Sequence, residues 1–353
     1  MAFNIEAAYG ALFPRFKKRV RQGEPLARHC TFGVGGPADV WVSLDSSQEL
    51  IELVRLCAGQ QWSLLLVGNG TNTLYADAGV RGIVSRIALD EYEIEDRGDG
   101  TALLVAEAGV SWPRLLNDLA AKGWGGLEFG PGIPGTLGGG VITNAGAHNS
   151  ELGTVLEWVE VLDARGASLA HDGVSVPILR RYLHNEIDLS YRYSRFRAGR
   201  EVRFDAQGYP IAPSRGQIEP AEIITRLGVR LHRADPAALK AAIDTYKAHR
   251  KQTQPPQQSA GSVFKNPPGD FAGRLIEAAG MKGVTHGKAQ ISPRHANFIV
   301  NLGGASAADV VALIVEARRR VLDQFGVALE LEVELRGEWN PGTQQAAGAI
   351  GTH

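Results

Sequence analysis

The sequence predicts an α+β protein, and three observations support this fold class. In the first 150 residues, short apolar strands alternate with amphipathic helices, and two of the strands run into glycine-rich loops. From Leu156 the pattern changes to strands of the kind that pair in antiparallel sheets. After a Gln/Pro-rich link at 252–259, helices and short strands alternate again. A length of 353 residues fits two or three domains of ordinary size.

The first predicted unit is a strand, a helix and a second strand. Residues 40–42 are apolar and predict the first strand. Ser46 is followed three residues later by Glu49, the pattern of a capping box, so a helix should begin there and end at about Gly59. The apolar run at 63–67 predicts a buried strand, which leads into the first glycine loop.

A second unit repeats this order. Residues 102–106 predict a strand, and Ser111 is placed to begin a helix that Gly123 ends. The chain then enters a longer glycine-rich stretch at 125–146. Two strands that end in glycine loops within 150 residues indicate a ligand-binding region.

The middle of the chain predicts an antiparallel sheet. Its strands are expected at 157–163, 191–197 and 222–232, with a turn at Arg165-Gly166. The polar segment 198–220 contains three prolines and is interpreted as a loop or excursion.

The C-terminal part predicts a separate α+β domain. Asp235 and Pro236 are typical of a helix start, and that helix should run to about Arg250. The elements expected after the link are a helix at 271–279, a strand at 297–301, a helix at 306–325 and a strand at 329–335. The tail 340–353 has no apolar periodicity and is predicted to be disordered.

Composition excludes several classes of protein. The formal net charge of −1 gives no electrostatic footprint for nucleic acid. Cys30 and Cys57 are too few for a disulfide framework or a cysteine-based zinc site, and the histidines lack metal-binding spacing. The N-terminus has no apolar signal region, and no segment is long enough to span a membrane. We therefore expect a soluble cytoplasmic protein without a metal, a membrane partner or an obligate protein partner.

Glycine is the unusual residue, with 43 of 353 positions against a typical ~7%. The pair Gly68 and Gly70 after a strand suggests a dinucleotide-binding fold, and Asp90 lies about 20 residues further on. Thr73 at the third glycine position and the glycines at 79 and 82 oppose that interpretation, because no crossover helix can begin there.

The second glycine cluster is a stronger signal. More than half of the residues from Gly130 to Gly140 are glycine, and each glycine costs backbone entropy when it becomes ordered. A buried ligand approached by bare backbone explains this density better than a solvent loop or a packing role does.

Five sequence blocks in a fixed order carry a resemblance to a known family. They are GNGTN at 68–72, GLEFGPGIPGTLGGGVITNAG at 126–146, YRYSRF at 191–196, SAGSVFKNP at 259–267 and LEVELRGEW at 331–339. Together they resemble the UDP-N-acetylenolpyruvoylglucosamine reductase (MurB) family of bacterial cell-wall synthesis. The resemblance covers roughly Leu26 to Trp339.

The resemblance implies an FAD-binding fold of the vanillyl-alcohol-oxidase type with a C-terminal α+β substrate-binding domain. The FAD-binding fold would comprise subdomain 1 (1–85, completed by the C-terminal strand 327–339) and subdomain 2 (86–235). The substrate domain would be 236–326. In that family NADPH reduces FAD, here expected to be bound non-covalently, and the flavin passes hydride to the enol ether of a UDP-sugar.

The resemblance also implies site residues. The flavin contacts would be Gly68, Asn69, Gly70, Thr71, Asn72, Gly132, Ile133, Pro134, Gly135, Gly139, Asn144 and Gly146. The catalytic residues would be Arg192, Ser262 and Glu332, and the substrate contacts would be Tyr191, Asn266 and His295.

The three implied catalytic residues suit the chemistry. Hydride addition to an enolpyruvyl ether pushes negative charge onto the adjacent carboxylate, which the planar cation of Arg192 can stabilise. Glu332 could help to stabilise this developing charge. The hydroxyl of Ser262 could protonate the neighbouring carbon. Without the resemblance, Arg192 could lie at the surface, Ser262 could cap a turn, and Glu332 would be placed on the solvent side of an alternating strand. His295 is as well explained by a structural role.

Some features differ from the family pattern. Segment 198–220 is longer than expected, and Thr253 stands where many members have lysine. Arg250, Lys251 and Lys265 are therefore all open candidates for contacting the substrate diphosphate. Two rival functions are an FAD-dependent alcohol or hydroxy-acid oxidase on the same fold, and a scaffold that binds FAD or a UDP-sugar without chemistry.

Overall fold

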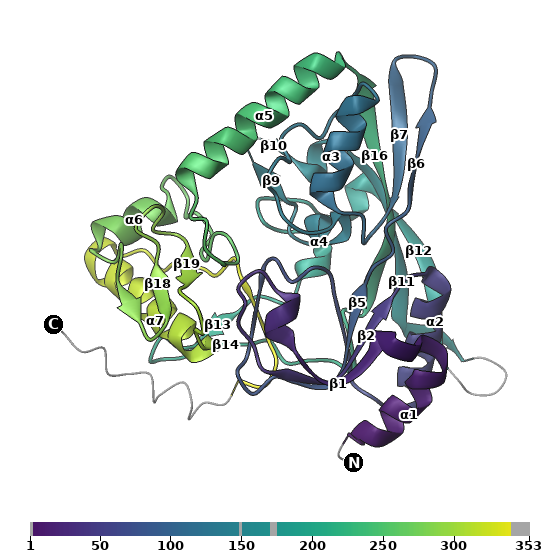
Figure 1. The fold of residues 1–353 in the computed structure, drawn as a ribbon, viewed down its shortest axis with the longest axis horizontal. Helices are drawn as coiled ribbons and strands as arrows, with labels where there is room; N and C mark the ends of the chain where they lie inside the picture. Colours follow the sequence, from purple (N-terminus) through teal and green to yellow (C-terminus); the bar gives the residue numbers. More distant parts are fainter. Residues whose placement is uncertain (1–2, 148–149, 170–174, 340–353) are drawn as a thin grey trace.

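The computed structural model describes residues 3–147, 150–169 and 175–339, which form two large sheets and a smaller C-terminal body (Figure 1). The tail predicted to be disordered lies outside these residues. Each of the three parts has its own cluster of buried apolar side chains.

The first sheet is formed mainly by the N-terminal region. In spatial order its strands are β1 (Val20–Pro25), β2 (Pro37–Leu44), β5 (Val80–Ile87), β3 (Leu64–Val67) and β15 (Ile218–Glu219). Helices α1 (Ile5–Phe16) and α2 (Ser47–Gln60) share its apolar core. Ser46 caps α2 as predicted, because its side chain accepts a hydrogen bond from the Glu49 N–H. The Glu49 carboxylate instead accepts from the N–H of Asp45, so the expected reciprocal bond of a capping box is missing.

The second sheet is antiparallel. In spatial order its strands are β12 (Ser175–Leu183), β11 (Leu156–Leu169), β16 (Glu222–Arg233), β7 (Thr101–Glu107) and β6 (Tyr92–Asp96), with β8 (Trp124–Gly125) also paired to β16. The helices α3 (Trp112–Ala121), α4 (Leu137–Ile142) and α5 (Pro236–Thr253) contribute to its core. The long helix α5 leads from this sheet towards the C-terminal body (Figure 1).

The C-terminal body contains a short antiparallel sheet and two helices. The sheet is formed by β17 (Thr285–His286), β18 (Ala289–Ile291) and β19 (Ile299–Asn301), and the helices are α6 (Ala272–Ala278) and α7 (Ala307–Phe325). Ser306 and Asp309 form a capping box at the start of α7, where the sequence predicts the helix to begin. Short pairs elsewhere are β9 (Gly146–Ala147) with β10 (Ser150–Glu151), and β13 (Arg203–Phe204) with β14 (Pro210–Ile211).

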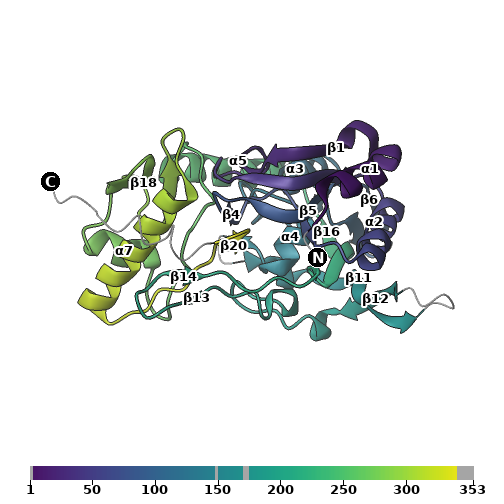
Figure 2. The ribbon, with the colours of Figure 1, turned by 90° about the horizontal axis from the view of Figure 1, so that it is seen from below.

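The last strand, β20 (Glu334–Arg336), leaves the C-terminal body and pairs in parallel with β4 (Thr73–Tyr75). Figure 2 shows this pair in the middle of the molecule, between α4 and the body around α7. β4 follows the GNGTN loop directly. The last strand of the chain therefore returns to a predicted flavin loop.

Three local predictions were wrong. The turn expected at Arg165-Gly166 is absent, because β11 continues to Leu169 with a shift of register after Asp163. The strand expected at 191–197 is a tight turn followed by a 3₁₀ helix, Arg195–Arg197. The strand expected at 329–335 is regular only at 334–336. Alternation of side chains predicted strands in the last two segments, whereas hydrogen bonds to distant residues decide their backbone.

Segment 198–220 is anchored at both ends. Its β15 forms the edge of the first sheet beside β3, and apolar side chains near β13 and β14 pack on the C-terminal core. The guanidinium of Arg318 on α7 lies 4.0 Å from the centre of the Phe204 ring. The segment expected to be a loop therefore links the first sheet to the C-terminal body.

Candidate active site

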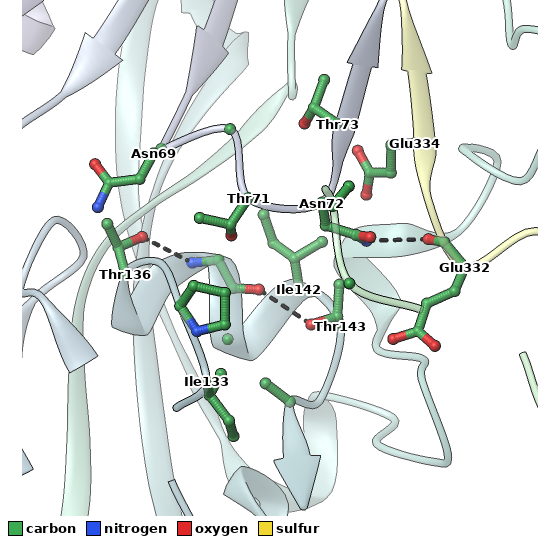
Figure 3. A pocket seen from close by; sticks show the side chains of 18 of the residues that line it. Asn69, Thr71, Asn72, Thr73, Ile133, Thr136, Ile142, Thr143, Glu332 and Glu334 are labelled. Carbon is green, nitrogen blue, oxygen red and sulfur yellow. Dashed lines mark hydrogen bonds between the residues drawn. The ribbon is translucent and has the colours of Figure 1, made fainter. Parts of the chain in front are cut away.

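The two predicted glycine loops pack against each other beside one cavity of about 400 Å³. A Cβ atom on Gly68 would lie 3.1 Å from Thr136 Oγ1, and one on Gly135 would lie 2.8 Å from Thr71 Oγ1. Figure 3 shows Asn69, Thr71 and Asn72 on one side and Ile133 and Thr136 facing them.

Most of the residues implied by the resemblance line this cavity. They are Gly68, Asn69, Gly70, Thr71, Asn72, Ile133, Pro134, Gly139, Gly146, Arg192, Ser262 and Glu332. Tyr191, Asn266 and His295 do not line it, and neither do Gly132, Gly135 and Asn144.

The first loop is suited to bind an anion. Among the described residues, none accepts a hydrogen bond from the backbone N–H groups of Asn69, Gly70, Thr71 or Asn72. Four consecutive donors without a protein partner, on a cavity, fit a ligand that carries phosphate groups. FAD is such a ligand, so these residues fit the cofactor that the sequence predicts.

The second glycine block has a packing role that the sequence analysis rejected. Gly130 and Gly140 lie against the indole of Trp112, and a Cβ atom on Gly138 would lie 2.7 Å from the Ala108 Cβ. Trp112 is 1% exposed, so its ring needs the space that these glycines leave. The density of glycine therefore reflects close packing of α4 on Trp112 as well as access to the cavity.

Arg192 lies in a tight turn with its side chain directed at Glu332. The turn is closed by two hydrogen bonds between Ser190 and Tyr193, and Arg192 has a φ of 55°. Its Nε lies 2.6 Å from Glu332 Oε1, and its Nη2 donates to the carbonyl of Gly146 at 3.3 Å. A left-handed conformation is costly for a residue other than glycine, so the surrounding contacts must hold it.

Asn144, one of the implied flavin contacts, supports this turn. It is fully buried, donates to the carbonyl of Ser190 and accepts from the N–H of Gly153. In this structure the side chain of Asn144 holds the Arg192 turn against the end of α4.

Glu332 lies beside the first loop with only 15% of its side chain exposed, rather than on a solvent face. Its carbonyl accepts a hydrogen bond from Asn72 Nδ2 at 3.0 Å, drawn in Figure 3. Burial raises the pKa of the Glu332 carboxyl, and the charges of Arg192 and Arg197 oppose that rise. A carboxyl with raised pKa and a paired guanidinium are features of catalytic sites.

Ser262 lies where two cavities meet. It lines the cavity already described and also a second one of about 430 Å³, which contains Asn266, His295, Arg274 and Arg294. Desolvation lowers the pKa of His295, which favours its neutral form. The second cavity thus offers two cations and neutral polar groups next to the candidate proton donor.

Tyr191 connects the turn that carries Arg192 to the segment that carries Asn266. Its side chain is 49% exposed, and its hydroxyl accepts a hydrogen bond from the N–H of Asn266 at 3.3 Å. Tyr191 is therefore in contact with Asn266, which lines the second cavity, although the two residues are far apart in the sequence.

The site also contains a buried cluster of charges that the sequence did not predict. Arg336 lies 2.5 Å from both Glu219 and Glu334, and Arg200 lies 3.2 Å from Glu334. Arg200, Glu334 and Arg336 line the first cavity. The alternation of Glu332, Glu334 and Arg336 was the only available signal, and it is ambiguous because alternating charges usually face solvent.

Electrostatics in this cluster favour ionised groups. Burial alone would raise the pKa of Glu334, but Arg200 and Arg336 outweigh it and hold the pKa at about 2. Burial would also lower the pKa of Arg336, yet the two carboxylates raise it.

The structure distinguishes the three basic residues that were left open as contacts of the substrate diphosphate. Arg250 lines the first cavity and donates to Gln254. Lys265 pairs with Glu330 at 3.3 Å, and Lys251 contributes its carbonyl to Arg294. Of the three, Arg250 is the one that reaches a described cavity.

Comparison with known proteins identifies two family domains in the chain. Residues 253–336 match the family "UDP-N-acetylenolpyruvoylglucosamine reductase, C-terminal domain", and residues 38–170 match "FAD binding domain". A UDP-N-acetylenolpyruvoylglucosamine reductase of Rubrobacter xylanophilus is 40% identical over 315 residues, 89% of this chain and 94% of that protein. This chain belongs to the UDP-N-acetylenolpyruvoylglucosamine reductase (MurB) family.

Other relatives support the assignment. A UDP-N-acetylenolpyruvoylglucosamine reductase of Heliobacterium modesticaldum is 40% identical over 327 residues, 92% of each chain. The crystal structure of MurB from Thermus caldophilus matches with a TM-score of 0.68 and 34% identity, over 90% of this chain and 98% of that one.

Membership confirms the resemblance and the predicted fold class. The chain is an FAD-dependent oxidoreductase with an FAD-binding domain and a MurB C-terminal domain. In the described ranges no helix is long and apolar enough to cross a membrane, and no group of His, Cys, Asp and Glu could hold a metal ion.

Gly135→Val should prevent FAD binding. Gly135 has a φ of +108°, and its new Cβ would lie 2.8 Å from Thr71 Oγ1, so the two loops could not pack as they do. The purified variant should be colourless. The control is Gly59→Val, because a Cβ on Gly59 meets no atom within 4 Å. A full flavin content in Gly135→Val would contradict the packing argument.

Glu334 should contribute to the pH dependence of stability. Its carboxyl has a pKa of about 2 in the folded chain and an ordinary value of 4.5. Between these values the unfolded state binds more protons, so this contribution is present above pH 4.5 and is lost as the pH falls towards 2. Glu334→Gln should flatten the acid limb of unfolding free energy against pH, measured by denaturant unfolding. Equal slopes in both proteins would show that folding does not lower the pKa of Glu334.

Proposed function

We propose that this enzyme reduces UDP-N-acetylenolpyruvoylglucosamine to UDP-N-acetylmuramate with NADPH, in the cytoplasm, as a step in peptidoglycan precursor synthesis. The observation that carries the proposal is the Arg192–Glu332 ion pair, which lines the same cavity as Ser262 and the two glycine loops. The names of the relatives support the substrate.

The predicted domains give each region a task. Subdomain 1 (1–85 with 327–339) and subdomain 2 (86–235) would hold FAD in the cavity that both glycine loops line, without a covalent link. The substrate domain (236–326) would hold the UDP-sugar in the cavity with Asn266 and His295. FAD, when bound, supplies the hydride that NADPH has given it, and this hydride goes to the terminal carbon of the enolpyruvyl group.

Arg192 is proposed to stabilise the charge that develops on the substrate. Hydride addition to the terminal carbon moves an electron pair towards the carboxylate, forming an enolate. Glu332 and the carbonyl of Gly146 hold the guanidinium of Arg192 in a fixed orientation. A fixed cation needs little reorganisation during the reaction, which is the source of its catalytic effect.

Ser262 is proposed to complete the reduction. Its hydroxyl proton passes to the carbon next to the carboxylate, a new C–H bond forms there, and the serine regains a proton from solvent. Its place at both cavities would put the hydroxyl between the flavin and the bound UDP-sugar.

One experiment tests the function as a whole. Flavin absorbance of the purified enzyme is followed after NADPH is added, with and without the enolpyruvyl substrate. We expect bleaching by NADPH and anaerobic recovery of the oxidised spectrum only with the substrate. Recovery that requires oxygen instead would favour the oxidase alternative, and no reaction at all would favour the scaffold.

Arg192→Ala should separate the two half-reactions. Reduction by NADPH should change little, whereas flavin oxidation by the substrate should slow by about 10²–10³-fold, as for loss of one charge-stabilising donor. Lysine should rescue only part of the rate, because it lacks the forked geometry of arginine. Stopped-flow absorbance measures both steps. Equal loss in both would show that Arg192 maintains structure instead.

Ser262→Ala should retain substrate binding and reduction by NADPH but lose flavin oxidation by the substrate. Loss of a general acid typically costs about 10²–10⁴-fold, and Ser262→Cys should recover some rate. In D₂O the wild-type product should carry deuterium at the carbon next to the carboxylate. An unimpaired oxidation step in Ser262→Ala would remove the acid role and leave the serine as a turn cap.

A further inference from the structure

Arg197 contacts the backbone of two proposed catalytic residues at once. It ends the 3₁₀ helix Arg195–Arg197, and only 3% of the residue is exposed. Its Nη1 donates to the carbonyl of Arg192 at 3.3 Å, and its Nη2 donates to the carbonyl of Glu332 at 2.6 Å. A guanidinium is a rigid planar fork, so these two bonds fix the two carbonyls relative to each other.

Neither of those residues is held by regular secondary structure. Arg192 has a φ of 55° within its tight turn, and Glu332 lies outside β20, which begins at Glu334. Their side chains nevertheless approach to 2.6 Å. The fork of Arg197 connects the two backbones through a single side chain.

The same set of bonds continues to the candidate proton donor. The N–H of Glu332 donates to the carbonyl of Val263 at 2.8 Å, and Val263 follows Ser262 in the chain. Arg197 therefore connects the Arg192 turn, through Glu332, to the segment that carries Ser262. The Arg192 turn lies between the two matched domains in the sequence, whereas Ser262 and Glu332 both lie within the matched C-terminal domain.

We infer that Arg197 is a positioning residue that sets the distance and orientation between Arg192, Glu332 and Ser262. The inference rests on the proposed function for its effect on rate. Arg197 does not line the cavity, so it acts through the two backbones that it holds. A displacement of about 1 Å between reacting groups can cost 10²-fold in rate. Loss of the two bonds from Arg197 should therefore slow the reaction.

The charge of Arg197 also affects the pKa of the Glu332 carboxyl. Burial raises the pKa of that carboxyl, whereas Arg192, Arg197 and, less strongly, Lys265 lower it. Loss of the Arg197 charge should therefore raise the pKa of Glu332. A residue that merely stabilised the fold would not shift this titration.

The test compares Arg197→Gln and Arg197→Lys with the matched control Arg195→Gln. Arg195 lies on the same 3₁₀ helix, but its side chain donates to the carbonyl of Glu186 and stacks on Tyr182. In Arg197→Gln we expect unchanged FAD content and reduction by NADPH, unchanged substrate KM, and flavin oxidation by the substrate slowed about 10- to 100-fold. Arg197→Lys keeps the charge with one donor nitrogen, so it should recover part of this rate, and the control should behave as wild type.

A second readout needs no turnover. The absorbance of bound FAD is titrated with pH, and Glu332→Gln identifies the transition that belongs to Glu332. That transition should move to higher pH in Arg197→Gln and stay near its wild-type position in Arg197→Lys. Wild-type enzyme that the substrate fails to oxidise would refute the proposed function, whereas the titration still tests Arg197. An unshifted titration, or loss of FAD and of both half-reactions together, would overturn the positioning role.

Discussion

The return of the last strand to the first glycine loop is the constraint on which the site depends. β20 pairs in parallel with β4, which follows Asn72 directly, and Asn72 bonds both Glu332 and Glu334 through its side-chain amide and its carbonyl. Side chains alternate along extended chain, so this register directs Glu332 and Glu334 to the same side, where both line the cavity. A slip of one residue would turn both carboxylates away and remove the partner of Arg192.

The glycine loops and the charged residues have different roles at the cavity. The first loop leaves backbone donors that find no acceptor among the described residues on one side of the cavity, as a phosphate-bearing ligand requires. The other side carries Arg192, Glu332 and the cluster around Arg336, and these charges are buried but mutually paired. Pairing matters because an unpaired buried charge is strongly destabilising.

Local signals in the sequence predicted local structure, and the family motifs predicted most of the cavity lining. Ser46 and Ser306 cap the expected helices because capping depends only on neighbouring residues. Strands were wrongly expected at 191–197 and over most of 329–335, because side chains far along the chain hold those backbones: Asn144 bonds the carbonyl of Ser190, and Arg197 bonds the carbonyl of Glu332. The same limit concealed the buried cluster, since the partners of Glu334 and Arg336 lie in segment 198–220.

That segment explains how an irregular C-terminal strand can be held so firmly. β20 is three residues long and pairs with a strand of the same length, so its backbone bonds alone fix it weakly. Segment 198–220 adds ion pairs from Arg200 to Glu334 and from Glu219 to Arg336, while β15 in turn is fixed to the first sheet. Breaking any one pair leaves a buried charge, so the pairs resist displacement together. The extra length of this segment thus stabilises the strand that carries the acidic residues into the cavity.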